Sequence, residues 1–217
     1  MANELHAVKE VVVQVGREML RSGLVVGTWG NVSARVPGGF VITPSGKGYL
    51  ETEASDLVVM DLEGKVLQGS KPSSEYHLHL HIYRARADIQ AVVHTHSIYA
   101  SAHAAARVPI PVSIEDLAMV NGGAVEVAEY ALPGTEDLAR NAVRALKERW
   151  AVLLANHGVA GGGRSVREAM LACQMVEKSA QINLMARSLG QPFELDREDV
   201  ELMRRNYLAS YGQSQIV

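Results

Sequence analysis

The sequence has little cysteine, few aromatic residues and no long apolar run. Its single cysteine, Cys173, excludes an internal disulfide and any metal site built from several thiolates. Charged residues interrupt every hydrophobic segment before it reaches the ~18 residues that a membrane helix needs, and residues 1–23 lack the apolar stretch of a signal peptide. A net charge of −3 does not suit non-specific binding to nucleic acid or anionic membranes. These absences favour a cytoplasmic protein without nucleic-acid or membrane partners.

What is present suits a folded core. Apolar residues make up 47% and charged residues 21% of the 217 residues. The length predicts a single domain over residues 1–217. Predicted strands alternate with helices throughout, which indicates an α/β or α+β sandwich. The irregular strand lengths and Gly-rich connections argue against a purely parallel sheet.

Hydrophobic periodicity and turn residues locate the elements. Apolar spacings of three and four predict helices at residues 4–22, 73–86, 97–106, 135–150, 166–189 and 196–209. Short apolar or β-branched runs predict strands at 32–36, 40–43 and 91–97, and within 151–159 a strand that ends at a turn. They also predict a hairpin turning at Glu63-Gly64 and short strands within 108–133 around the loop 121–123.

Three histidines follow predicted buried strands. His94 and His96 are two residues apart, so on a strand both imidazoles project from one face. His157 follows the apolar run 151–154 beside Gly158. Each could be an ordinary strand-end histidine, and His157 could simply stabilise a turn. Together they match the three-imidazole set that a catalytic zinc uses with one position open.

A second histidine tract, His77, His79 and His81, lies in the predicted helix 73–86. On a helix His77 and His81 share one face while His79 points elsewhere. The pair at i and i+4 could bind a metal, but histidines at the surface or an interface are the more common explanation.

Small polar residues mark three loops that could bind an anion. Ser73-Ser74-Glu75 begins a predicted helix, where free amides attract anions, although Ser is also an ordinary N-cap. Ser45-Gly46 and Gly30-Asn31 are weaker signals of the same kind. Glu115-Asp116, in an otherwise apolar segment, are either buried carboxylates suited to acid–base catalysis or an exposed turn.

The segments GTWGNVSAR, ITPSG, PSSE, AVVHTHS and NHG, in this order, resemble the class II aldolase/adducin family, and most closely its L-fuculose-1-phosphate aldolase branch. The resemblance implies a three-layer α/β/α sandwich around a central, mainly antiparallel sheet. It also implies a homotetramer with active sites at subunit interfaces. By position it makes Glu75, His94, His96 and His157 the ligands of one Zn²⁺ per subunit, with Mn²⁺ or Co²⁺ also compatible.

The same resemblance implies an enzyme that cleaves a small ketose 1-phosphate to dihydroxyacetone phosphate and an aldehyde. Zinc would stabilise the enediolate, and Glu75 would return the proton to C3. The substrate phosphate would be held by Gly30, Asn31, Ser45, Gly46, Ser73 and Ser74.

One departure concerns the residue that handles the C4 hydroxyl. The aldolase branch uses a tyrosine from the adjacent subunit, but here no tyrosine lies between Tyr99 and Tyr130. Glu115, or else Asp116, occupies that region, and Tyr211 resembles the family's C-terminal tyrosine that closes over the site. A carboxylate there keeps open an epimerase, a dehydratase or a decarboxylase, whereas Glu75 favours an aldolase. An adducin-like interaction module without catalysis is the remote alternative.

Overall fold

An eight-stranded sheet forms the centre of the structure, a computed structural model that describes residues 2–209. The strand order is β4-β3-β2-β1-β5-β8-β7-β6, and all neighbours are antiparallel except β6 and β7. The strands are β1 (Asn31–Val36), β2 (Gly39–Ile42), β3 (Val58–Asp61), β4 (Val66–Gln68), β5 (Ala91–Thr95), β6 (Val127–Ala128), β7 (Ala151–Leu154) and β8 (Gly158–Gly163).

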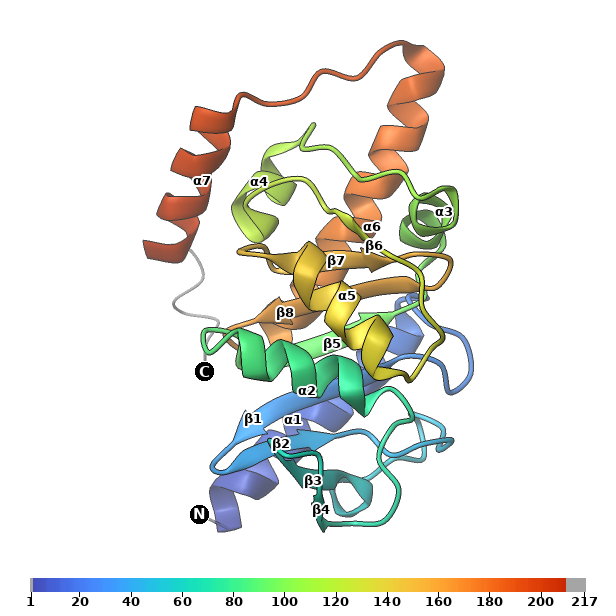
Figure 1. Cartoon of the computed structure of the whole chain (residues 1–217), viewed down its shortest axis with the longest axis vertical. Helices are drawn as coiled ribbons and strands as arrows, with labels where there is room; N and C mark the ends of the chain where they lie inside the picture. The colour runs from blue at the N-terminus through green and yellow to red at the C-terminus, as the bar shows by residue number, and fades with distance from the viewer. Residues whose placement is uncertain (1, 210–217) are drawn as a thin grey trace.

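Helices cover both faces of this sheet (Figure 1). One face packs against α1 (Ala2–Arg21), α3 (Ile98–Ala106) and α6 (Val166–Leu189), and the other against α2 (Tyr76–Ala85) and α5 (Glu136–Leu146). Beyond β7 lie α4 (Glu115–Asn121) and α7 (Arg197–Ala209) (Figure 1). The predicted three-layer α/β/α sandwich is therefore confirmed. No helix in residues 2–209 has the length and apolar character to cross a membrane.

The alternation of side chains along β5 explains both cores. Ala91 and Val93 pack toward α1 and α6, whereas Val92 packs toward α2 and α5. Because both faces are buried, the strand reads as a continuous apolar run. His94 shares the parity of Val92, so its ring projects on the side of the sheet that α2 covers.

Two segments differ from the prediction. Residues 115–121 form helix α4 instead of short strands, because Leu117, Ala118 and Asn121 are buried on one face and Gly122, at φ 74°, ends the helix. Only β6 and an isolated bridge between Ile110 and Val125 represent the expected strands of this region.

As predicted, the segment 151–159 contains a strand, β7, that ends at the turn carrying His157, but the chain then continues into a second strand. This second strand, β8, is rich in glycine and was missed. A Cβ at Gly161 would lie 2.7 Å from the Cys173 sulfur, and one at Gly163 would lie 2.5 Å from the Ala169 nitrogen. Glycine therefore allows α6 to approach this strand closely, a tertiary requirement that local propensity does not reveal.

Candidate active site

Three imidazoles converge where β5 and β7 end. His94 is in β5, His96 follows it, and His157 lies in the turn between β7 and β8. The Nε2 atom of His94 lies 2.9 Å from that of His96 and 3.3 Å from that of His157. The predicted pairing of His94 with His96 and His157 is present in the structure.

Backbone geometry sets the orientation of two of these rings. Asn156 adopts a left-handed conformation with φ 57°, which an Asn tolerates better than most residues, and the chain turns there to present His157. The Nδ1–H of His94 donates to the Val159 carbonyl at 2.9 Å. That bond fixes the tautomer of the neutral ring, so that Nε2 is the nitrogen that would bind a metal in place of a proton.

Glu75 closes the cluster from the opposite side. Its two carboxylate oxygens lie 3.2 Å from His94 Nε2 and 3.3 Å from His157 Nε2. Burial alone would raise the pKa of Glu75, but His94, His157 and the Asn31 amide together hold it well below its usual range. The side chain is therefore a carboxylate at neutral pH.

The donor set fits a divalent metal. Burial, followed by the charge of His94, lowers the pKa of His96 to about 3 and that of His157 to about 4, so both rings are neutral. Their lone pairs face one another beside a carboxylate, and Glu75 Oε1 is buried without a hydrogen-bond partner. Candidate ligand atoms of Glu75, His94, His96 and His157 all lie within 4.8 Å of one another. Three imidazoles and one carboxylate are what a catalytic zinc or a similar ion binds.

A cleft of about 530 Å³ opens beside this cluster. Its lining includes Glu75, His96 and His157. The six residues predicted to hold a phosphate line it too: Gly30, Asn31, Ser45, Gly46, Ser73 and Ser74. Sequence segments far apart thus meet at one opening.

Backbone pairing brings the two serine loops together. Ser73 N–H donates to the Thr43 carbonyl at 3.0 Å, and Ser45 N–H donates to the Lys71 carbonyl at 3.1 Å. This extended pairing also explains why α2 begins three residues later than predicted. Glu75 is the N-cap of the helix and not a residue of its first turn.

Gly30 joins the third loop to the metal-binding strand. Its φ is 77°, and a Cβ would lie 2.6 Å from the His94 carbonyl oxygen. The Tyr49 hydroxyl donates to the Gly30 carbonyl at 2.7 Å and holds the loop in place. A side chain at residue 30 would therefore push the loop away from β5.

A buried hydrogen-bond chain behind Glu75 escaped sequence analysis. Asn31 Nδ2 donates to Glu75 Oε2 at 3.1 Å, and His79 Nε2 bonds to Asn31 Oδ1. Ser33 Oγ lies 2.6 Å from both His79 Nδ1 and the Tyr83 hydroxyl. His79 is fully buried, so the expectation of a surface histidine tract is wrong for this residue. The sequence signal for its burial was the position of His79 among the apolar residues of the helix.

Three predicted catalytic residues have different outcomes. Glu75 lies in the cluster. Glu115 is exposed in the first turn of α4 and does not line the cleft, and Asp116 pairs with Lys178. Of the two alternatives for Glu115 and Asp116, the structure excludes burial in an apolar segment, and their exposed position is the start of a helix instead of a turn between strands. Tyr211 lies outside the described residues.

Two aromatic residues of the cleft were not predicted. The Trp29 ring lies 5.5 Å from the His96 ring, and Tyr130 and Pro133 also line the cleft. Both aromatic side chains are at least half exposed. They give the cleft an apolar rim next to its polar floor.

Comparison with known proteins identifies the family. The model of the class II aldolase and adducin N-terminal domain matches residues 10–184. The chain belongs to this family. Its relatives are named aldolases, and the chain is accordingly a class II aldolase, a lyase.

Three similar proteins span nearly the whole chain. The 5-deoxy-D-ribulose 1-phosphate aldolase of Bacillus thuringiensis serovar kurstaki is 39% identical over 94% of this chain and 97% of its own length. The 5-methylthioribulose-1-phosphate/5-deoxyribulose-1-phosphate aldolase of Rhodospirillum rubrum is 33% identical, over 96% of this chain and 94% of its own. A solved L-fuculose 1-phosphate aldolase matches with a TM-score of 0.90 and 40% identity, covering 93% of this chain and 96% of the other.

Proposed function

We propose that this aldolase uses a divalent metal, Zn²⁺ in the first instance, to cleave a short ketose 1-phosphate. The products are dihydroxyacetone phosphate and an aldehyde. The observation that carries the proposal is the contact of the Glu75 carboxylate with His94 Nε2 and His157 Nε2, at 3.2 and 3.3 Å. This contact supports Glu75 both as a metal ligand beside the three histidines and as the proton-transferring group.

The phosphate end of the substrate has a matching surface. The hydroxyls of Ser73 and Ser74 and the backbone of Ser45-Gly46 and Gly30 line the cleft beside the metal-binding residues. Neutral hydroxyls and amides bind phosphate without needing a lysine or arginine. Holding the unreactive end positions the C3–C4 bond for cleavage.

Cleavage requires two proton transfers. A base removes the proton of the C4 hydroxyl, the C3–C4 bond breaks, and its electron pair passes to C3 and the C2 oxygen. An acid then protonates C3 to complete dihydroxyacetone phosphate. A divalent metal held by these residues supplies Lewis acidity toward the negative charge that develops on the substrate oxygens.

Glu75 is the group we assign to C3. Its carboxylate is ionised and buried beside the histidines, and it faces the cleft that would hold the substrate. If substrate oxygens replaced the carboxylate in this ligand set, Glu75 would be free to carry a proton. Asn31 remains beside it as a hydrogen-bond donor.

The C4 proton needs a second base, and Glu75, which we assign to C3, is the one carboxylate among the described residues that line the cleft. Glu115 is exposed on α4, away from the cleft lining, so it can serve only a neighbouring subunit's cleft. We therefore propose a homotetramer in which Glu115, with Tyr211 as the other candidate, completes the adjacent site.

The apolar rim favours a substrate with a hydrophobic tail. Trp29, Tyr130 and Pro133 offer no charged group to a terminal hydroxyl. A 5-deoxypentulose 1-phosphate, whose aldehyde fragment is acetaldehyde, suits this rim and agrees with the named activity of the Bacillus relative. An L-fuculose 1-phosphate, which would yield lactaldehyde, is the second candidate and agrees with the structural relative.

Condensation with a panel of aldehydes tests the proposal. Metal-loaded protein is incubated with dihydroxyacetone phosphate and acetaldehyde, lactaldehyde or glycolaldehyde, and new ketose phosphates are detected by mass. We expect a product whose formation stops with chelator, and fastest with acetaldehyde. Absence of product with every aldehyde, from folded and metal-loaded protein, would contradict aldol chemistry and shift the assignment to epimerisation, dehydration or decarboxylation.

A further inference from the structure

A second cluster of metal-binding side chains lies outside the cleft, where α2 and α5 begin side by side (Figure 1). His77 and His81 are one helical turn apart on α2, and Glu136 is the first residue of α5. One ligand atom from each lies within 4.8 Å of the other two. None of the three lines the cleft of the catalytic histidines.

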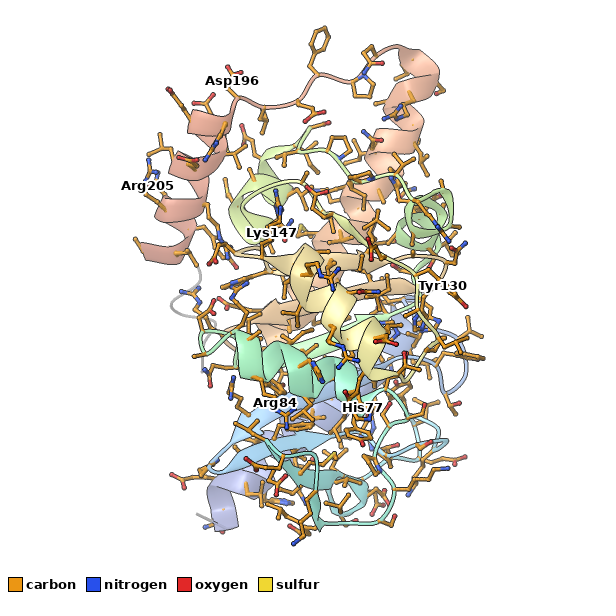
Figure 2. The ribbon with its side chains drawn as sticks, viewed as in Figure 1. His77, Arg84, Tyr130, Lys147, Asp196 and Arg205 are labelled. Carbon is orange, nitrogen blue, oxygen red and sulfur yellow. The ribbon has the colours of Figure 1, made fainter. Side chains whose placement is uncertain are left out.

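The His77 ring is fixed by its neighbours, and one of its nitrogens has no polar partner. The His77 ring stacks on Tyr76 with centroids 4.1 Å apart and lies 6.4 Å from the His81 ring. His77 Nδ1 is buried without a hydrogen-bond partner, which is costly for a polar atom. Figure 2 shows His77 at the end of α2 that faces α5.

Neighbouring charges leave the donor atoms available. Burial, and then the charge of Arg84, lowers the pKa of His81, so its ring is neutral and its lone pair is free at pH 7. Glu136 pairs with Arg140 at 3.0 Å, but Arg140 also pairs with Asp137 at 2.8 Å. Arg140 therefore keeps an acceptor when Glu136 turns toward a metal.

The chemistry of the three groups selects the kind of ion. Two imidazoles and one carboxylate suit Zn²⁺, Co²⁺, Ni²⁺ or Cu²⁺, whereas Mg²⁺ and Ca²⁺ require mostly oxygen ligands. All three side chains are at least partly exposed, so water completes the coordination and the ion exchanges readily.

We propose that His77, His81 and Glu136 form a second transition-metal site that fastens the first two turns of α2 to the first turn of α5. The segments before these two helices carry both walls of the cleft, with Glu75 ahead of α2 and with Tyr130 and Pro133 ahead of α5. An ion bound between the helices restrains both walls without entering the cleft. Whether an ion binds here does not depend on which reaction the cleft performs.

Zinc titration of the full-length protein tests the site. Protein whose tight site is already filled is titrated with ZnCl₂ in a calorimeter, and the thermal unfolding midpoint is followed in parallel. We expect a second, weaker equivalent per chain with Kd in the micromolar range, and a midpoint that rises as this equivalent binds.

Variants distinguish this cluster from adventitious binding. His81→Ala should remove the second equivalent and its effect on the midpoint, while the first equivalent stays bound. Glu136→Gln, on the exposed start of α5, should weaken the second equivalent at least about tenfold, because losing a ligand costs no less than losing an outer-shell partner of one. His6→Ala is the matched control, since it removes an exposed histidine from an i,i+4 pair with Glu10 and should change nothing.

Three results would overturn the proposal. The first is a wild-type protein that still binds only one equivalent of zinc per chain when free zinc reaches 100 μM, on the order of a hundred times the micromolar Kd expected. The second is an unchanged second equivalent in both His81→Ala and Glu136→Gln. The third is its loss in His6→Ala.

Discussion

His79 bonds through Nε2 to the side-chain oxygen of Asn31, and this bond decides which end of the Asn31 amide faces Glu75. The Asn31 nitrogen donates to a carboxylate, so its oxygen must accept, and His79 Nε2 must carry the proton. Burial lowers the pKa of His79 to about 3, so the neutral ring accepts a hydrogen bond from Ser33 at Nδ1. The direction of the whole chain follows from these assignments.

The first prediction concerns His79 as a positioning residue. His79→Leu leaves Asn31, the partner of Glu75, free to rotate, and we expect kcat to fall about tenfold, the lower end of the usual loss when the partner of a metal ligand is disturbed. His79→Gln keeps an N–H donor near the position of Nε2 and should restore part of the rate. Steady-state kinetics of both variants, at matched thermal stability, give the answer. A wild-type kcat in His79→Leu would show that the hydrogen bonds from His79 through Asn31 to Glu75 do not contribute to catalysis.

The second prediction concerns the metal ligands. His94→Ala or His96→Ala removes an imidazole from the cluster, and we expect metal content and activity to be lost with little change in fold. Metal analysis and circular dichroism of the purified variants measure the two effects separately. Full activity in either variant would show that the cluster is not the catalytic metal site.

The third prediction separates metal binding from proton transfer. Glu75→Gln keeps the size and one oxygen of the side chain but removes its basicity. We expect metal to remain largely bound while kcat falls about 10²- to 10⁴-fold, the range for loss of a general acid–base group. Turnover equal to that of the wild type would exclude Glu75 from the chemistry.

The fourth prediction tests Glu115. Because this side chain is exposed, Glu115→Gln should alter stability by no more than about 0.5 kcal/mol, so a slower reaction reports on catalysis. Glu198→Gln is the matched control, since Glu198 is also exposed in the first turn of a helix. An unaffected rate in Glu115→Gln would direct attention to Asp116, Tyr211 or water.

The fifth prediction concerns the pH dependence of the metal-free protein. The folded protein keeps His79, His96 and His157 neutral down to about pH 4, with pKa values of about 3, 3 and 4. The unfolded chain protonates them near the ordinary value of about 6.5, so stability falls as pH drops through this window. The raised pKa of His94 acts in the opposite sense, but it is one group against three. A urea midpoint at pH 5 equal to or above that at pH 7.5 would contradict this balance.

Patterns confined to one element predicted most of the fold. The helix 166–189 has the expected bounds, and the hairpin turns at Glu63-Gly64 as its sequence indicated. Helix α4 was missed because a seven-residue amphipathic segment resembles two short strands. Strand β8 was missed because its glycines are selected by the approach of α6 and not by strand propensity.

The site residues that could be predicted are those that lie in short sequence segments resembling the family. His94, His96, His157 and Glu75 came from such segments, and the structure brings them within 4.8 Å of one another. The role of His79 could not be predicted, because it depends on the strand β1 that lies opposite α2. The cleft rim of Trp29 and Tyr130 likewise depends on two loops meeting in space.

Cleavage of a 5-deoxypentulose 1-phosphate by metal-free and re-metallated protein tests the central claim most directly. Release of dihydroxyacetone phosphate is measured with a coupled assay that reduces it. The account predicts no release after chelation, recovery on adding about one equivalent of Zn²⁺ per chain, and none in His94→Ala under the same conditions. Equal release from the chelated and the re-metallated protein would contradict a reaction that depends on the Glu75–histidine cluster.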